Sequence, residues 1–350
     1  GANLVNAPGP TTSTSDPVID TNPTLGAKWV NKTSGEVYIC TDATTDENVW
    51  TNVGAGSGDV EPFSYAGSSY GYCCGGYPYT NTIDKTSFTS DANSVDAGNL
   101  VSNINEAAGC GDGAYGWVAG GYPYNNVIQK FQFVTDGDAT DIADLLTTLL
   151  APSGCNSENY GYTVGGLSGP IQNVIQRWAF ASTANSVDVG NLTLATRGGS
   201  SSSSSTHGFA IGGENSGSPA GHTDTIGKFS FASGTEDAVD HGNLYVSRKA
   251  SAGNSSATHG FNSAGHNGSA GINSIDRFAF ASNTTATDWA DMTESKYGVA
   301  GTSSTTYGYQ HGGHTPVVNT VAKFPYASQT NASDVGDLTV ARMGPTGNQY

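Results

Sequence analysis

A dense group of chemically reactive residue types stands near residue 70. The stretch "YGYCCGGYPYTNTIDK", from Tyr70 to Lys85, joins two adjacent cysteines, four tyrosines and a lysine. Thiols and phenols close together are typical of nucleophilic and metal-binding sites. Forty-five residues further on, "YGWVAGGYPYNNVIQK", from Tyr115 to Lys130, keeps the pattern but carries valine and alanine where the cysteines stood. The stretch therefore indicates one copy of a repeated block, with the cysteines at ordinary strand positions.

The repeated block occurs six times. Each copy opens on Tyr-Gly or His-Gly, runs to a glycine pair (Ala264-Gly265 in the fifth copy), and continues into a strand of alternating apolar and polar residues. The copies are 45 to 52 residues apart, a period typical of β-propellers, which make one four-stranded blade from each repeat. We therefore predict an all-β chain with a six-bladed propeller over residues 63–350. The six opening dipeptides begin at Tyr70, Tyr115, Tyr160, His207, His259 and Tyr307.

Two charged positions recur in every copy, a cation in the second strand and an aspartate in the third. Six-fold repetition is what a scaffold requires, whereas a ring of binding sites is the weaker alternative. We expect an ion pair within each blade or a cation that bonds strand-end carbonyls, with the aspartate capping a turn. The cations are Lys85, Lys130, Arg177, Lys228, Arg277 and Lys323, and the aspartates are Asp96, Asp141, Asp188, Asp240, Asp288 and Asp334. Four copies add a further cation, at Arg197, Arg248, Lys296 and Arg342.

The C-terminal segment is predicted to close the ring. Tyr350 lies 43 residues after Tyr307, which places it in the register of Tyr70. A closed propeller needs its last blade completed by strands from both ends of the repeat region. We therefore expect the C-terminal residues to pair with the strand around Phe63–Tyr72.

The N-terminal residues differ in composition from the repeats. Residues 1–22 are rich in Pro, Ser, Thr and Asn and are predicted to be an extended arm. Residues 23–53 show three short strands with two tryptophans and a tyrosine, which predicts a small three-stranded β module. Residues 54–62 are predicted to be a Gly-rich linker. Because some thirty residues barely support a core, we expect docking or oligomer contacts for this module.

Charge and cysteine usage exclude several classes of function. The net charge is -17 with only 13 Lys and Arg, which argues against nucleic acid and anionic membrane surfaces. No apolar run approaches the roughly 20 residues of a membrane-spanning helix. The cysteines form no C-x-x-C pattern, so we expect free buried thiols, and we predict no cofactor. They are Cys40, Cys73, Cys74, Cys110 and Cys155.

Two groups of residues contain the types that bind metal ions, but neither group fits a metal-site pattern well. "TDGDATDIAD", residues 135–144, is rich in aspartate, but it aligns with repeat segments that lack the extra acids and has no glutamate at the twelfth position. His266, His311 and His314 lie in or beside loops of adjacent copies. Histidine also replaces tyrosine at the start of two copies, which favours a packing role. We predict no metal and no catalytic residues.

The loops after the glycine pairs vary from copy to copy. Variable loops on a constant ring are where a propeller carries recognition. The tyrosines in two of these loops are therefore the candidate binding residues, either stacking on sugar rings or anchoring a protein partner. They are Tyr77, Tyr79, Tyr122 and Tyr124.

The paired glycines, the strand after them and the period near 47 residues resemble kelch repeats, although the Trp that kelch units usually place before the last strand is missing. The segment "FASTANSVDVGNLTLATRGGSSSSSSTHGFAIGG" is more similar to a kelch-like group in virion structural proteins of tailed phages, notably those of marine cyanobacteria. The resemblance covers residues 63–350. It implies a non-enzymatic fibre, appendage or capsid-surface component at the virion surface.

The N-terminal pattern also resembles small β modules of phage fibre proteins. This resemblance implies that residues 1–53 attach to other virion proteins in an oligomeric assembly, and that the propeller faces outward towards a host-surface glycan or protein. Two alternatives remain open. One is a secreted or cell-surface carbohydrate-binding or adhesive protein of a bacterium. The other is a propeller enzyme that resembles galactose oxidase, whose copper site crosslinks a tyrosine to a cysteine.

Overall fold

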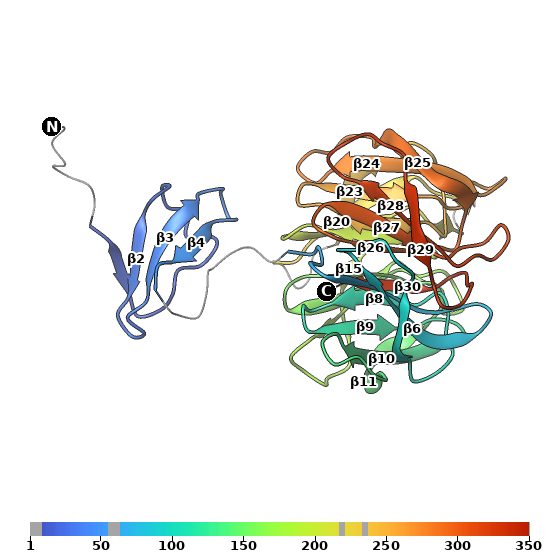
Figure 1. Cartoon of the computed structure of the whole chain (residues 1–350), viewed down its shortest axis with the longest axis horizontal. Helices are drawn as coiled ribbons and strands as arrows, with labels where there is room; N and C mark the ends of the chain where they lie inside the picture. Colours follow the sequence, from blue (N-terminus) through green and yellow to red (C-terminus); the bar gives the residue numbers. More distant parts are fainter. Residues whose placement is uncertain (1–8, 55–63, 217–220, 233–236, 350) are drawn as a thin grey trace. The chain divides into compact units, whose positions relative to one another are not determined.

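The computed structural model describes residues 9–54, 64–216, 221–232 and 237–349. The chain divides into two compact units, Gly1–Phe63 and Ser64–Tyr350 (Figure 1). Regular structure in the described residues is β-strand throughout, which confirms the all-β prediction. Within the same residues no helix has the length and apolar character needed to cross a membrane. Apart from Gly54, the predicted linker over residues 54–62 lies outside the described residues.

The N-terminal unit contains one four-stranded sheet. Its tyrosine and second tryptophan, Tyr38 and Trp50, are buried, and Trp29 meets Trp50 edge-to-face at 5.9 Å. The three strands expected in residues 23–53 are present, and a fourth comes from the segment expected to be an extended arm. This fourth strand pairs in parallel with the edge of the strand that contains Trp29. Close to this pairing, the Trp29 indole donates a hydrogen bond to the Ser15 carbonyl. The strands are β1 (Thr11–Ser13), β2 (Lys28–Asn31), β3 (Val37–Asp42) and β4 (Val49–Asn52).

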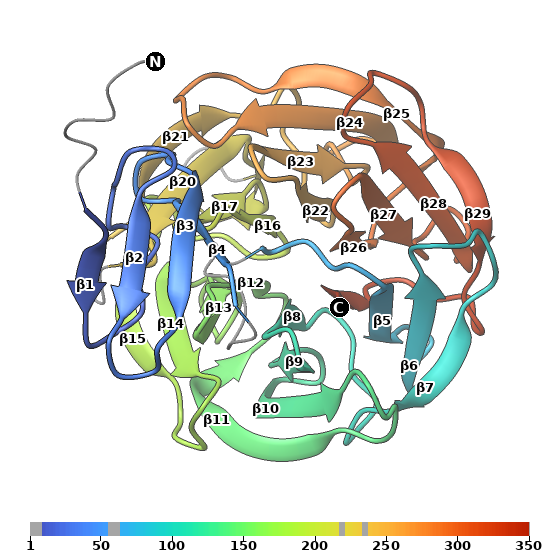
Figure 2. The ribbon, with the colours of Figure 1, turned by 60° about the vertical axis from the view of Figure 1, so that its left-hand side comes forward.

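The second unit contains six four-stranded antiparallel sheets within its described residues. Figure 2 shows them arranged around a central axis, in a propeller-like fold. The first three sheets are β30 (Thr346–Gln349), β5 (Tyr70–Gly76), β6 (Thr80–Ser87) and β7 (Val95–Asn99); β8 (Ala108–Gly111), β9 (Tyr115–Ala119), β10 (Asn125–Gln132) and β11 (Thr140–Leu149); and β12 (Ser153–Asn156), β13 (Tyr160–Val164), β14 (Val174–Ala179) and β15 (Val187–Asn191).

The other three sheets follow the same order of strands. They are β16 (Ser200–Ser203), β17 (His207–Ile211), β20 (Thr225–Ser230) and β21 (Val239–Asn243); β22 (Ala252–Ser255), β23 (His259–Ser263), β24 (Ile272–Ala279) and β25 (Thr287–Lys296); and β26 (Ala300–Ser303), β27 (Tyr307–His311), β28 (Thr320–Pro325) and β29 (Ser333–Asp337). A short ribbon, β18 (Glu214–Asn215) and β19 (Gly221–His222), extends the fourth sheet's loop. The innermost strands contact one another around the ring in the order β8, β12, β16, β22, β26, β30 and back to β8.

The sheet that closes the ring combines strands from both ends of the second unit. β30 pairs antiparallel with β5, with Gln349 opposite Gly71 and Thr346 opposite Cys74. Closure by the C-terminal segment is therefore confirmed, but its partner strand is Tyr70–Gly76 and not the expected Phe63–Tyr72. The residues before β5 are used differently, since Gly67 bridges in parallel to the sixth sheet. Phe63 and Tyr350 lie outside the described residues.

Packing between aromatic rings and glycine explains the Tyr-Gly and His-Gly dipeptides. A Cβ added to Gly116 would lie 2.3 Å from the ring of Phe131, on the neighbouring strand of the same sheet. The same close contact recurs between Gly260 and Phe278. Glycine at this position lets an aromatic ring lie flat on the backbone of the next strand. The sheets thereby obtain a core from large aromatic residues, which compensates for a chain with few long aliphatic side chains.

All five cysteines are free and buried, as predicted. Burial raises the pKa of Cys73 and of Cys155 to about 12. These thiols therefore stay protonated at neutral pH, and a protonated buried thiol is a poor nucleophile and metal ligand. The cysteine pair in "YGYCCGG" consequently serves as packing in β5.

Candidate functional site

The six recurring cations lie over aromatic rings of their own sheets. The Lys85 ammonium is 4.3 Å from the ring centroid of Tyr70, and the Arg177 guanidinium is 4.4 Å from that of Tyr160. A cation over a ring face is attracted by the ring quadrupole. The expected pairing of cation and aspartate within a blade is wrong: Lys85 instead pairs at 3.0 Å with Asp136 of the next sheet. The remaining cation–ring pairs are Lys130 with Tyr115, Lys228 with Phe209, Arg277 with Trp289, and Lys323 with Tyr307.

The recurring aspartates cap turns, as the sequence suggested. The Asp96 carboxylate accepts a hydrogen bond from the Gly98 backbone N–H at 2.9 Å. The same bond forms at Asp188, Asp240 and Asp334, where a glycine also stands two residues later. Asp141 and Asp288 are followed by alanine at that place, and there the strand continues for 10 residues instead of five. The aspartates are therefore local capping residues and do not pair with the cations.

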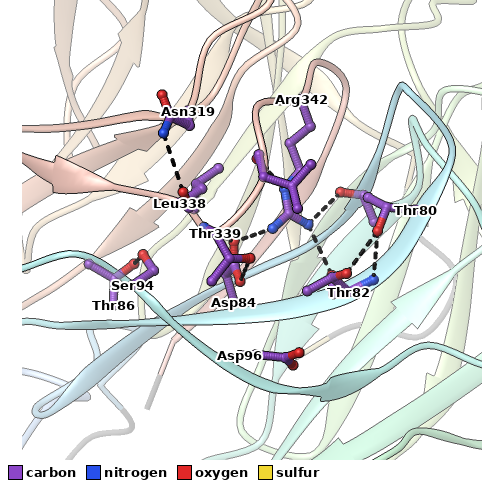
Figure 3. Close-up of polar contacts among 12 residues, drawn as sticks. Thr80, Thr82, Asp84, Thr86, Ser94, Asp96, Asn319, Leu338, Thr339 and Arg342 are labelled. Atoms are coloured by element: carbon purple, nitrogen blue, oxygen red, sulfur yellow. Dashed lines mark hydrogen bonds and ion pairs between the residues drawn. The ribbon is translucent and has the colours of Figure 1, made fainter.

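A buried ion pair joins the connection before β30 to the first sheet. Arg342 and Asp84 are fully buried and paired with each other (Figure 3). The Arg342 guanidinium also donates to the carbonyls of Gly75 and Thr82, each at 3.0 Å. Asp84 accepts further hydrogen bonds from the backbone and hydroxyl of Thr339. Each charge thus has several partners, which is the condition under which a buried pair is tolerated.

The same arrangement recurs before the fifth sheet and corrects the sequence alignment. Arg248 pairs with Asp276 at 2.6 Å, and both side chains are fully buried. Arg342, Lys296 and Arg248 therefore occupy one position. Arg197 does not share it, because the backbone of Arg197 bridges to Glu214 just as that of Lys249 bridges to His266. Arg197 lies nine residues after the recurring aspartate of its copy, Asp188. The other three cations lie eight residues after theirs, so Thr196 holds their position in that copy.

Lys296 occupies the buried arginine position without an acidic partner. Its side chain is 1% exposed, and among the described residues its Nζ has no hydrogen-bond partner. Burial lowers the pKa of Lys296 below its usual value, while Glu294 and Asp334 act in the opposite direction. The strand position that carries Asp84 and Asp276 in the other two sheets carries Ala322 here.

Six residues, one from the connection into each sheet, form a closed ring of backbone hydrogen bonds, here called the backbone ring. Each N–H donates to the carbonyl of the equivalent residue of the preceding sheet, at 2.6–3.1 Å. The last of these bonds returns to the starting sheet, so every connection is tied to both of its neighbours. The members are Glu106, Ala151, Gly198, Ala250, Gly298 and Gly344.

A cavity of about 320 Å³ opens at the backbone ring, and all six ring members line it. We call this end of the second unit the cavity face. Three charged side chains on the wall form one network, in which Glu214 accepts from Arg197 at 3.0 Å and from Lys249 at 2.5 Å. These side chains are a quarter to a third exposed. The volume lies at the lower end of the range for small-molecule sites, roughly 300–1,000 Å³.

Glu106 adds a fourth charged group to the cavity wall. Its side chain is exposed within the described structure, but the surrounding protein raises its pKa by desolvation, while Arg197 and Lys249 lower it. The cavity therefore combines two carboxylates with two cations. Sequence analysis did not single out Glu106, Glu214 or Lys249: the two glutamates do not recur, and Lys249 was hidden because its equivalent, Arg197, was aligned with Arg248.

Three of the four candidate tyrosines meet beside this cavity. Tyr79 stacks on Tyr122 with ring centroids 5.7 Å apart, and Tyr77 meets Tyr79 edge-to-face at 5.4 Å. We call Tyr77, Tyr79 and Tyr122 the tyrosine patch; each is 39–46% exposed. The backbone of Tyr77 bridges to Met343 on the cavity wall, and that of Tyr122 bridges to Asn105, next to Glu106. Tyr124 is also exposed, at 48%.

The histidines and aspartates weighed as metal ligands are engaged elsewhere. His311 is buried and its Nε2 lies 2.9 Å from the Thr302 hydroxyl, whereas His314 and His266 pack against Tyr297. In the loop at residues 135–144, Asp138 accepts two hydrogen bonds from Asn99. Over the described ranges no group of three or more His, Cys, Asp or Glu side chains is placed to hold a metal ion.

Beyond the backbone ring a narrow channel runs between the innermost strands, and the segment before β5 crosses its far end. Small residues of the innermost strands line it, among them Gly154 and Gly253, together with Tyr65. The Gln349 amide donates to the Tyr65 carbonyl at 3.0 Å, and Gly67 pairs with the end of the sixth sheet. Figure 2 shows the segment before β5 crossing the centre of the ring. The chain therefore enters the second unit at the end of the channel opposite the cavity face.

Comparison with known proteins concerns the fold. No protein-family model and no curated protein matches the chain. A solved structure described as "Structure of YjhT" is similar to it with a TM-score of 0.61 and 10% sequence identity, over 71% of this chain and 88% of that one. At such low identity the likeness extends to the fold alone. This chain shares its all-β, propeller-like fold with that structure.

Proposed function

We propose that the chain is a non-enzymatic virion structural protein, in which residues 1–53 attach to the particle and a six-bladed, kelch-like propeller presents its cavity face for recognition. The main support is the contrast between a repeated framework and a rim that holds four different residue types at its six equivalent positions. By the rim we mean the first residue after each glycine pair, and after Ala264-Gly265 in the fifth copy. These residues are Tyr77, Tyr122, Leu167, Glu214, His266 and His314. Variation confined to one face of a regular scaffold is typical of a recognition surface.

The path of the chain also supports this arrangement. The second unit begins at the far end of its channel, near Tyr65, and the cavity lies at the opposite end. The cavity face is therefore not the end at which the described part of the second unit begins. The buried state of Cys73 and Cys74 removes the feature that suggested an oxidase.

The test is the location of the chain. Antibodies raised against the full chain should label the surface of purified particles of the tailed phage that encodes it, in immunogold electron microscopy. Mass spectrometry of the same particles should detect the chain at a stoichiometry that fits an oligomeric component. Recovery of the chain only from culture fluid, with unlabelled particles, would contradict the proposal and favour the secreted carbohydrate-binding alternative.

A further inference from the structure

One side chain in the cavity is not required by the framework. All six positions of the backbone ring have positive φ, from 51° at Glu106 to 63° at Gly298. Glycine fits this conformation best, and it occupies three of the six positions. Alanine occupies two, and Glu106 is the single member with a polar side chain. A residue held in an unfavourable conformation at a cavity wall points to a functional role for its side chain.

The charged groups around Glu106 indicate the chemistry of a ligand. Arg197 and Lys249 both contact Glu214 and both act electrostatically on Glu106. Two cations and two carboxylates give the wall a formal charge of zero. The wall nevertheless offers both donors and acceptors of hydrogen bonds at short range. An uncharged ligand with many hydroxyl groups satisfies both kinds, because a hydroxyl donates and accepts.

Other classes of ligand fit less well. An anion would have to compete with Glu214 for cations that are already paired, and it would approach a chain with a net charge of -17. A cation would meet carboxylates that Arg197 and Lys249 already offset. An apolar ligand would cover four charged groups without giving them partners, which is costly.

The tyrosine patch continues the site outward from the cavity. Tyr79 lies close enough to Glu106 to feel its charge, and Tyr77 is joined through its backbone to Met343 on the wall. Exposed phenol rings offer flat apolar faces with a polar tip. The apolar face of a sugar ring matches this surface, while its hydroxyls match the polar tips and the cavity wall.

We propose that the cavity face binds a neutral glycan chain, with its terminal sugar in the cavity beside Glu106 and the next sugar on the tyrosine patch. The proposal rests on the proposed function, since it names the ligand class of that recognition face. Glu106 and the Arg197–Glu214–Lys249 network would select hydroxyl positions of the terminal sugar, and Tyr79 would hold the following ring.

The test is binding of defined oligosaccharides to the full chain. The probes are neutral trisaccharides of glucose, of mannose and of galactose, with sialyllactose and a sulfated disaccharide as charged probes, measured by saturation-transfer NMR and titration calorimetry. At least one neutral trisaccharide is expected to bind. Glu106→Gly should lower its affinity at least tenfold, and so should Tyr79→Ala.

The variants have matched controls. Glycine already occupies the equivalent position of the backbone ring in three sheets, so the Glu106→Gly variant should keep the melting temperature of the unaltered chain. Glu106→Ala is a second variant, since alanine stands at this position in Ala151 and Ala250. Glu158→Gln removes an exposed carboxylate outside the cavity lining and should bind as the unaltered chain does. Tyr245→Ala removes an exposed tyrosine outside the patch and should also leave binding unchanged.

Three results would overturn the proposal: no neutral probe binds, only the charged probes bind, or binding survives Glu106→Gly and Glu106→Ala unchanged. None of these bears on where the chain resides. Immunogold labelling of particles tests the virion location separately, so failure of the ligand class and failure of the proposed function give different results.

Discussion

Arg248 and Lys249 are neighbours in the chain but belong to two different regions of the molecule. Arg248 is fully buried and bonds Asp276 and the carbonyls of Ala264 and Ser274. Lys249 is a third exposed and contacts Glu214 on the cavity wall. In an extended connection, successive side chains point to opposite sides. One residue therefore serves the junction between sheets, and the next serves the cavity.

This alternation recurs in the connections into the sixth and first sheets and separates stability from recognition. A change at the buried position alters the junction between sheets, whereas a change at the cavity position alters only the rim. The two sets of residues are consequently free to vary independently. The buried positions hold Arg248, Lys296 and Arg342, and the cavity positions that follow them hold Lys249, Tyr297 and Met343.

Deleting residues 343–350 should have the largest effect. The deletion removes β30, leaves β5 without its inner partner and opens the backbone ring at Gly344. We expect the melting temperature to fall by more than about 10 °C, since each kcal/mol shifts a large domain by roughly 2–4 °C. Differential scanning calorimetry measures this. Deletion of residues 1–53 is the control and should leave the unfolding transition of the second unit at the same temperature. An unchanged melting temperature after deletion of residues 343–350 would exclude closure by β30.

Asp276→Ala should have the next largest effect. It leaves the buried Arg248 guanidinium without its carboxylate, which costs about 3–5 kcal/mol. Urea unfolding followed by tryptophan fluorescence measures the loss. Asp276→Asn keeps an acceptor for the backbone N–H groups of Tyr245 and Val246 and should lose less. Equal losses in the two variants would show that the acceptor oxygen contributes nothing and that the loss comes from the charge of Asp276.

Lys296→Met should stabilise the second unit. It replaces a buried ammonium without an acidic partner by an apolar chain of similar length, a change worth about 1–3 kcal/mol. The native state lowers the pKa of Lys296, so the unfolded chain binds more protons between the native and the unfolded pKa. The stability of the unaltered chain should therefore rise with pH through that window, up to about 10.4.

The measurement is urea unfolding of both proteins at pH 7 and at pH 10. The advantage of Lys296→Met should shrink at the higher pH, because close to the unfolded pKa of about 10.4 the buried lysine loses its proton at little cost. A gap that stays constant or widens would show that the native state does not lower the pKa of Lys296.

Glu214→Gln should have the smallest effect on stability. Its ion pairs are a quarter to a third exposed, and such pairs contribute about 1 kcal/mol or less. We expect the melting temperature to change by only a few degrees. A loss as large as that of Asp276→Ala would mean that the cavity wall also holds the sheets together. Thermal unfolding of the two variants in the same buffer makes this comparison.

The sequence allowed the framework to be predicted because the framework repeats. The Tyr-Gly dipeptide, the capping aspartate before Gly98 and the free state of the cysteines all follow from comparing one copy with its sisters. The partner of Lys85 did not follow, since the register of neighbouring sheets decides that it reaches Asp136 instead of Asp96. Arg197 was grouped with Arg248 although it lies one residue further from the aspartate of its copy, and the backbone pairing shows that it matches Lys249 instead.

By itself, the sequence determined the strands, their order and the position of the glycines, because these depend on local alternation and on contacts that recur in every copy. Only the tertiary structure decided that Glu106, Arg197, Glu214 and Lys249 share one cavity with the tyrosine patch beside it. Glu106, Arg197 and Lys249 come from connections into three different sheets, and Glu214 lies on β18. They meet because ring closure brings the end of every connection to one axis, a consequence of the whole circle of sheets and of no single repeat.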